Sequence, residues 1–212
     1  MRDVRMSKVQ SRLRAVVLGI GALAFLFPFY YMVIGSLQTE PDPTVGGAFP
    51  NPANLTVDNY TAINERINLL QGLVNSGIFT GGVLLGTMVF GLLVGYALAQ
   101  LEWRGRGATF ALALLWRIAL PLVRPAIITV VLLTFIGPWN EFLWPFLITK
   151  DAALQPLAVS LANYISNVAA SASNPFGATL AGAVVLAGPV VLLFIFFQRY
   201  FISNDIGSGV KG

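Results

Sequence analysis

Four long apolar runs constrain the fold of this chain more than any other feature. They cover about residues 15–37, 77–99, 125–148 and 177–199. At roughly 1.5 Å per residue, a helix over each run can cross the hydrocarbon core of a bilayer, which is about 30 Å thick. Only 10% of the residues are charged, whereas a soluble domain carries about 25%. The sequence therefore predicts an all-α, polytopic transmembrane helical bundle that forms a single domain over residues 1–212.

The first run is predicted to remain in the mature protein as a membrane span. A cleaved signal peptide would have an apolar core of about 7–15 residues, followed by a small-residue cleavage site. The run Ala15–Leu37 is longer than such a core, and its far half is rich in aromatic residues.

The distribution of Lys and Arg predicts the orientation. With both termini in the cytoplasm, the outer loops hold only Arg66 and Lys150. The inner segments then hold Arg2, Arg5, Lys8, Arg12, Arg14, Arg104, Arg106, Arg117, Arg124, Arg199 and Lys211. Because cytoplasmic segments carry the excess of positive residues, we expect a multi-pass protein of the plasma or inner membrane with both termini cytoplasmic.

Several function classes are excluded by residues that the sequence lacks. The chain has no cysteine and no histidine, so we expect no thiol chemistry, no metal site and no cofactor. It has no GxxxxGK[ST] motif for binding ATP. The net charge of +4 fits membrane orientation better than nucleic-acid binding. The chain is therefore not expected to be an enzyme.

The third apolar run contains the most informative polar residues. Gly137-Pro138 is predicted to break the helix, and the polar segment Trp139-Asn140-Glu141 follows. A helix break leaves backbone N–H and carbonyl groups without their helical partners. At membrane depth this is tolerated where protein or water forms hydrogen bonds with these groups. Asn140 and Glu141 can bind sugar hydroxyls, and Trp139 and Trp144 can stack on sugar rings. The alternative is that the tryptophans mark the headgroup region and that Glu141 lies near the outer surface.

Two connections on the outer side carry further helix signals. Asp58 is expected to start a short amphipathic helix in the loop between the first two spans, and residues 156–170 have helix-compatible content. On the inner side, Ala108–Leu115 is too short to span. We interpret it as a stub, followed by an interfacial approach over Trp116–Arg124.

In their order along the chain, several stretches resemble the smaller permease subunit of carbohydrate-importing ABC transporters, the maltose-permease type. These stretches are YYMVIGSLQTE, FPNPANLTVDNYTAI, Asn75-Ser76, GYALAQLEWRGRG, WRIALPLVRPA, FIGPWNEFLWPFLI, Gln155-Pro156-Leu157 and the terminal GVKG. The resemblance implies sugar import by alternating access, with ATP hydrolysed on a separate subunit.

The chain departs from the family pattern between Leu115 and Trp116. In the family, two further spans and a cytoplasmic loop with a Glu-Ala-Ala…Gly signature lie at this place, and that loop docks into the ATPase. The absent part would be on the order of seventy residues. A truncated gene product, a degraded paralogue and a sequence with one region left out are all compatible with this gap.

The resemblance also implies partners and contact residues. The expected partners are a second permease subunit, a dimer of ATP-binding subunits and an extracellular or periplasmic solute-binding protein. The residues expected to face the ATPase are Arg117, Arg124, Gly209 and Lys211. For the two arginines, positive-inside anchoring is the alternative. Two other functions stay open, namely a channel or secondary transporter without an ATPase, and a non-functional remnant permease.

Overall fold

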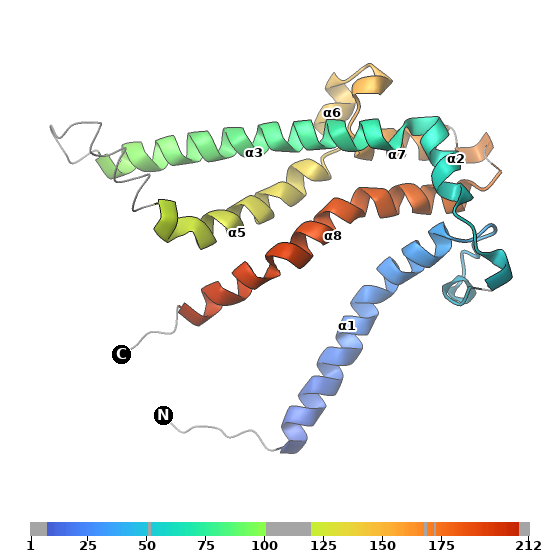
Figure 1. The fold of residues 1–212 in the computed structure, drawn as a ribbon, viewed down its shortest axis with the longest axis horizontal. Coiled ribbons are helices and arrows are strands. Elements are labelled where there is room, and N and C mark those ends of the chain that lie inside the picture. The colour runs from blue at the N-terminus through green and yellow to red at the C-terminus, as the bar shows by residue number, and fades with distance from the viewer. Residues whose placement is uncertain (1–7, 51, 101–119, 168, 172, 208–212) are drawn as a thin grey trace. The chain divides into compact units, whose positions relative to one another are not determined.

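The computed structural model describes residues 8–50, 52–100, 120–167, 169–171 and 173–207, and these residues are helical with connecting loops (Figure 1). The α-helices are α1 (Lys8–Ser36), α2 (Asp58–Ile67), α3 (Leu69–Gln100), α5 (Leu120–Trp139), α6 (Leu143–Ile148), α7 (Leu157–Asn167) and α8 (Pro175–Gly207). Short 3-10 helices are η1 (Val45–Ala48), η2 (Pro52–Asn54), η4 (Ala152–Leu154) and η5 (Ala169–Ser171). No β-strand occurs among the described residues apart from an isolated bridge between Gln38 and Leu55.

The chain divides into two compact units. One contains Met1–Arg66 and Tyr164–Val184, and the other contains Ile67–Asn163 and Val185–Gly212. Helix α8 therefore contributes residues to both units.

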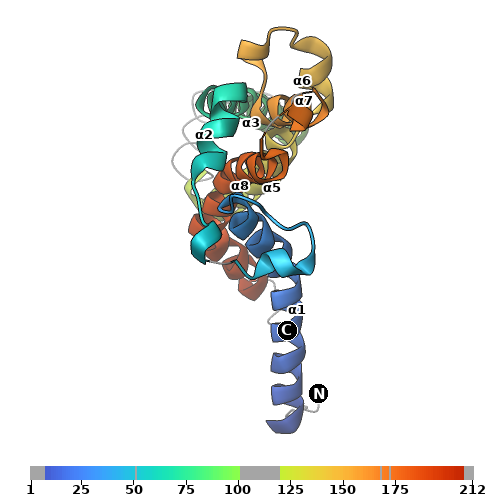
Figure 2. The ribbon, with the colours of Figure 1, turned by 90° about the vertical axis from the view of Figure 1, so that its right-hand side faces the viewer.

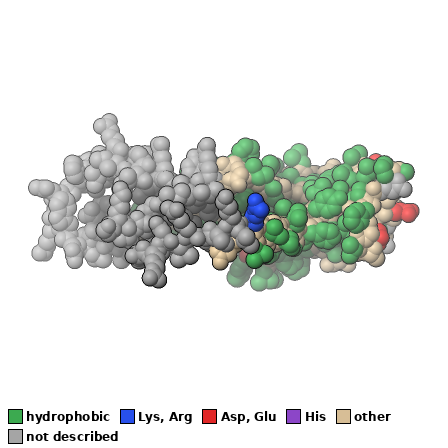
Figure 3. Space-filling view, turned by 90° about the horizontal axis from the view of Figure 1, so that it is seen from below, with side chains coloured by type: hydrophobic (Ala, Val, Ile, Leu, Met, Phe, Trp, Pro, Cys, Tyr) green, Lys and Arg blue, Asp and Glu red, His purple; other side chains and the backbone are tan. Residues whose placement is uncertain are grey.

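Within the part of the chain that the structure describes, three helices are long and apolar enough to cross a membrane: Arg12–Ser36, Leu69–Leu93 and Pro175–Gln198. Large apolar side chains on them are exposed, for example Phe25, with 82% of its surface accessible. Hydrophobic side chains also cover much of the described surface in Figure 3. Apolar exposure on this scale fits a surface that faces lipid or other membrane subunits rather than water. The chain is thus a multi-pass membrane protein.

The apolar stretch 125–148 contains two helices, with an interruption next to the predicted break at Gly137-Pro138. Helix α5 ends at Trp139 and α6 begins only at Leu143, so the apolar part that the structure describes in α5 is the shorter stretch Ile127–Trp139. Pro138 has no N–H to continue the ladder, and the Asn140 N–H bonds to both the Ile136 and Gly137 carbonyls, at 3.3 and 3.2 Å. The helix therefore ends just after the predicted break at Gly137-Pro138.

Helix α3 begins eight residues before the predicted second span, at Leu69 rather than residue 77. Asp58 starts α2 as predicted, and α2 is separated from α3 by Asn68 alone. Asn68 has a φ of 47°, a conformation that asparagine tolerates better than most residues. Its side-chain oxygen accepts a hydrogen bond from the Gln71 N–H at 3.1 Å, which stabilises the first turn of α3.

The loop after α1 folds back onto the end of that helix (Figure 2). The Tyr30 hydroxyl donates to the Ala48 carbonyl at 2.9 Å, and the Tyr31 hydroxyl donates to the Asp42 carbonyl. Gln38 donates to the Gly47 carbonyl at 3.0 Å. A Cβ at Gly47 would collide with the backbone oxygen of Asp42, so this close approach requires glycine.

Candidate functional site

Trp139, the first of the predicted substrate-path residues, joins two helices. Its indole Nε1–H donates to the Leu186 carbonyl of α8 at 2.9 Å, and its ring stacks on Phe135 with centroids 5.2 Å apart. Only 5% of Trp139 is exposed. Pro189 lies three residues after Leu186 inside α8, and prolines loosen the backbone of the preceding helical turn. The indole is therefore engaged with protein in this structure.

Asn140 and Glu141 stabilise the break between α5 and α6. The Asn140 side-chain amide donates to the Ile136 carbonyl at 2.9 Å, which satisfies a terminal carbonyl of α5. The Glu141 Oε1 atom accepts the Leu143 and Trp144 N–H groups at 3.0 and 3.5 Å. These contacts use one carboxylate oxygen, and no described residue bonds the other.

Trp144 is exposed, with 62% of its surface accessible. It lies in the first turn of α6, beside Glu141, which is only partly buried. The structure thus brings a carboxylate and an open indole ring together. Trp139 and Asn140, by contrast, are held by helix contacts.

Asn75 and Ser76 form a polar clamp that the residue pattern alone did not reveal. The Asn75 amide donates to the carbonyls of Ala153 and Gln155 at 2.9 and 3.0 Å. The Ser76 hydroxyl accepts the Leu157 N–H at 2.9 Å. This clamp fixes the loop before α7 on α3. The only sequence signal was that Asn75-Ser76 and Gln155-Pro156-Leu157 both belong to the stretches that resemble the family.

Gly72 makes the clamp sterically feasible. A Cβ at this position would lie 3.2 Å from the Cα and Cβ atoms of Leu157. The other glycines that stud α3 do not have such a neighbour. No described atom outside the helix lies within 4 Å of a Cβ built at Gly81, Gly91 or Gly95.

Asn59 and Asn174 form a second buried network, within the other unit. Asn59 is 4% exposed and donates to the Ser36 and Gln38 carbonyls at 3.0 and 2.7 Å. Asn174 donates to the Asn59 Oδ1 atom at 2.9 Å and to the Thr39 carbonyl at 2.7 Å. The network ties the end of α1 to the starts of α2 and α8.

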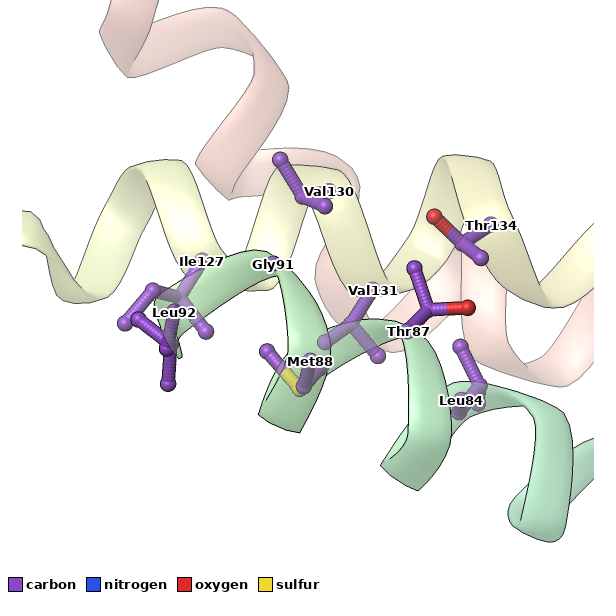
Figure 4. A pocket seen from close by; sticks show the side chains of 9 residues that line it. All are labelled: Leu84, Thr87, Met88, Gly91, Leu92, Ile127, Val130, Val131 and Thr134. Atoms are coloured by element: carbon purple, nitrogen blue, oxygen red, sulfur yellow. The ribbon is translucent and has the colours of Figure 1, made fainter. Parts of the chain in front are cut away.

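A cavity of about 230 Å³ lies between α3 and α5 (Figure 4). It is lined by Leu84, Thr87, Met88, Gly91, Leu92, Ile127, Val130, Val131 and Thr134. Among the described lining residues, Thr87 and Thr134 supply the hydroxyls, and none of these residues is charged. Such a lining suits an apolar occupant. Among the described residues, no group of three or more carboxylate, thiol or imidazole side chains is placed to hold a metal ion.

Comparisons with known proteins relate the chain to membrane subunits of sugar importers. The arabinooligosaccharides transport system permease protein AraQ of Halalkalibacterium halodurans is 23% identical, over 93% of this chain and 96% of AraQ. The trehalose/maltose transport system permease protein MalG of Thermococcus litoralis is 24% identical, over 94% of this chain and 98% of MalG. The chain is a homologue of sugar ABC transporter permeases. No protein-family model matches it.

A solved structure shares the fold of this permease homologue. It is a chain of a bacterial ABC transporter involved in the import of the acidic polysaccharide alginate. The TM-score is 0.55 at 21% identity, and the match covers 95% of this chain and 99% of that chain. The likeness confirms the predicted all-α membrane fold.

The alignment between the permease homologue and AraQ is longer than the part of this chain that it covers. It extends over 271 positions, to which 93% of the 212-residue chain contributes, or about 197 residues. About 74 positions therefore have no residue from this chain. The deletion near residues 115–116 stays a prediction. Its predicted place, the Leu115–Trp116 junction, lies outside the described residues.

The residues predicted to face an ATPase are not located by the structure. Arg117, Gly209 and Lys211 lie outside the described residues. The backbone of Arg124 is part of α5, but its side chain is not described. Their role stays a prediction.

Proposed function

We propose that this chain is the permease subunit of a binding-protein-dependent ABC importer that moves a sugar or oligosaccharide into the cytoplasm. The observation that carries the proposal is the match to sugar importer permeases over nearly the whole length of both chains. AraQ is named for arabinooligosaccharides and MalG for trehalose and maltose. These names support a carbohydrate as the solute and leave its identity open.

The energy source in this proposal is a separate dimer of ATP-binding subunits. The sequence has no ATP-binding motif of its own, and its relatives are permease subunits of transport systems. The dimer would close against the cytoplasmic face, and the bundle would alternate between outward and inward access. The proposal includes a second permease subunit, a solute-binding protein and cytoplasmic termini, the last supported by the Lys and Arg distribution.

The proposed substrate path passes the break between α5 and α6. There, Glu141 would accept a hydrogen bond from a sugar hydroxyl through its free oxygen, and Trp144 would stack on a ring face. Trp139 and Asn140 would shape the path indirectly, because their polar groups bind the backbone of α8 and α5. We assign them the role of holding the two helix ends in place.

A remnant that no longer couples to an ATPase is the second candidate function. The total of about 74 positions without a residue of this chain in the alignment with AraQ favours it, since the resemblance places the docking loop in a part that this chain lacks. Arg117, Arg124, Gly209 and Lys211 would then be the remaining ATPase contacts.

Reconstitution separates these functions. The chain is co-expressed with the permease and ATPase subunits encoded beside its gene, purified by a tag on the chain, and placed in proteoliposomes. Co-purification and ATP-dependent uptake of radiolabelled arabinotriose or maltotriose are expected. Uptake by the chain alone would indicate a channel or secondary transporter. Failure to retain any ATPase would indicate the remnant.

A further inference from the structure

A polar cavity of about 320 Å³ lies in the unit that contains α1, α2 and the start of α8. We call it the Tyr164 cavity. The residues that matter for its chemistry are Thr39, Asp58, Glu65, Arg66, Tyr164 and Ser173. All six lie outside the three candidate membrane spans. The cavity shares no residue with the α5–α6 break that we propose for the substrate path.

Tyr164 is the buried anchor of this cavity. It is only 1% exposed, yet its hydroxyl has no hydrogen-bond partner among the described residues. The hydroxyl is not among the fully buried side-chain atoms that lack a partner in the described residues, so water or a ligand in the cavity can reach it. Burial raises the pKa of Tyr164, and the nearby positive charge of Arg66 partly opposes this rise. The hydroxyl is therefore protonated at neutral pH and free to donate.

The rim of the cavity offers charges of both signs. Asp58 and Glu65 are acceptors, Arg66 is a donor, and all three side chains are exposed. No ion pair joins Arg66 to a described carboxylate. The two carboxylates would repel an anion. The guanidinium would repel a cation and so weaken the attraction of the carboxylates for it. A ligand with many hydroxyls can donate to the carboxylates and accept from the guanidinium and the tyrosine.

The wall behind these groups is rigid. Asn59 and Asn174 also line the cavity, but their amides are already bonded to each other and to the backbone of Gln38. Ala62 and Ala178 add small apolar patches. The volume is at the lower end of the range for ligand pockets, about 300–1,000 Å³, which fits one ring rather than a chain segment.

From these observations we propose that the Tyr164 cavity is a binding site for one neutral sugar ring, additional to the translocation route. The inference goes beyond the proposed import function. It requires binding by this chain without any partner subunit.

Binding can be measured on the full chain in phosphatidylcholine nanodiscs, which avoid detergents with sugar headgroups. The probes are L-arabinose, D-glucose and D-galactose. Their binding is measured by saturation-transfer NMR and by calorimetry. At least one of them should bind at millimolar concentration, and sodium phosphate should not compete. Tyr164→Phe should weaken binding by roughly 2–10-fold, the value of one hydrogen bond. Glu65→Gln should weaken it by about fivefold or more.

Two further variants keep the result interpretable. Glu40→Gln removes an exposed carboxylate of the same unit that does not line the cavity, and binding should be unchanged. Ala62→Phe should fill the cavity from the exposed side of α2 and abolish binding, while the helical circular dichroism spectrum stays the same.

The inference is overturned if none of the three sugars binds, if phosphate displaces them, or if Tyr164→Phe, Glu65→Gln and Ala62→Phe all leave binding unchanged. The two proposals can fail separately. If the complete complex imports sugar but the chain alone binds none of the probes, this inference is overturned and the transport proposal stands.

Discussion

The indole of Trp139 donates a hydrogen bond to the Leu186 carbonyl across 2.9 Å, three residues before a proline in α8. This bond ties the last residue of α5 to a point where α8 is weakened. The sequence suggested that Trp139 stacks on the substrate or lies at the membrane interface. In the structure, its indole joins α5 to α8.

Trp139→Phe should destabilise the protein by about 0.5–1.5 kcal/mol, because hydrogen bonds between membrane helices contribute on this scale. An aromatic ring that can stack on Phe135 is retained, while the N–H and the pyrrole part of the buried indole are lost. Reversible unfolding in mixed micelles measures the change. Trp144→Phe is the matched control, since Trp144 is exposed. Equal effects of the two substitutions would rule out the role of the bond.

Asn59→Ala should cost about 2–3 kcal/mol. The substitution removes the Asn59 bond to the buried Ser36 carbonyl and one of the two bonds to the Gln38 carbonyl, and it takes the Asn59 acceptor from the Asn174 amide. An unsatisfied buried group costs about 1–3 kcal/mol. Thermal unfolding in detergent monitors the loss. Asn140→Ala, which removes one exposed bond, should cost less than about 1 kcal/mol. A smaller effect at Asn59 than at Asn140 would contradict the network.

Gly72→Ala should leave the protein about 1–2 kcal/mol less stable than Gly81→Ala. A Cβ at Gly72 lies 3.2 Å from the Leu157 backbone, so the loop must move. A Cβ at Gly81 meets open space and adds helix propensity. Hydrogen exchange should show faster opening of residues 153–157 only in Gly72→Ala. Equal stability of the two variants would refute the close approach.

The loop around Asp42 should become less ordered in acid. Hydrogen bonds from the Thr44 N–H and hydroxyl lower the pKa of Asp42. A carboxyl whose pKa is lower in the folded than in the unfolded state adds stability above its unfolded value, about 3.9, and this is lost as pH falls through the folded value. Amide exchange at Thr44 and Gly46 should rise below about pH 4, and Asp42→Asn should remove this dependence.

Glu141→Gln should reduce uptake by the complete complex by about tenfold, while membrane insertion stays intact. Glutamine keeps an oxygen that can accept the Leu143 N–H, so the start of α6 is preserved and only the charge is lost. A hydrogen bond to a charged group is worth about 1.5–3 kcal/mol. Trp144→Ala should also reduce uptake. Unchanged transport in both variants would remove the break between α5 and α6 from the substrate path.

Local pattern was enough to predict the helical fold and several helix limits. The apolar runs located α1, α3 and α8, and Asp58 marked the start of α2. The end of α5 was predicted to within two residues, because Pro138 acts on its own backbone. The start of α3 was missed, because Asn75 and Ser76 resemble a polar boundary. Their partners are 78 to 81 residues away, and no spacing rule reveals such contacts.

The candidate site was harder to predict for the same reason. Whether an indole stacks on a solute or bonds a carbonyl depends on which helix lies opposite it, and the residues around Trp139 do not contain that information. Tyr164 gave no signal at all in the sequence, since its burial and its free hydroxyl arise only from the packing of the helices around it.

The Ser76–Leu157 bond also bears on how such permeases can be recombined. The first N–H of α7 donates to Ser76 in α3. The segment 150–163 therefore depends on α3 for one of its hydrogen bonds and cannot be exchanged by itself. A chimera that takes residues 150–163 from a relative would need the donor's residues 72–76 as well, since otherwise the graft begins with an unsatisfied amide.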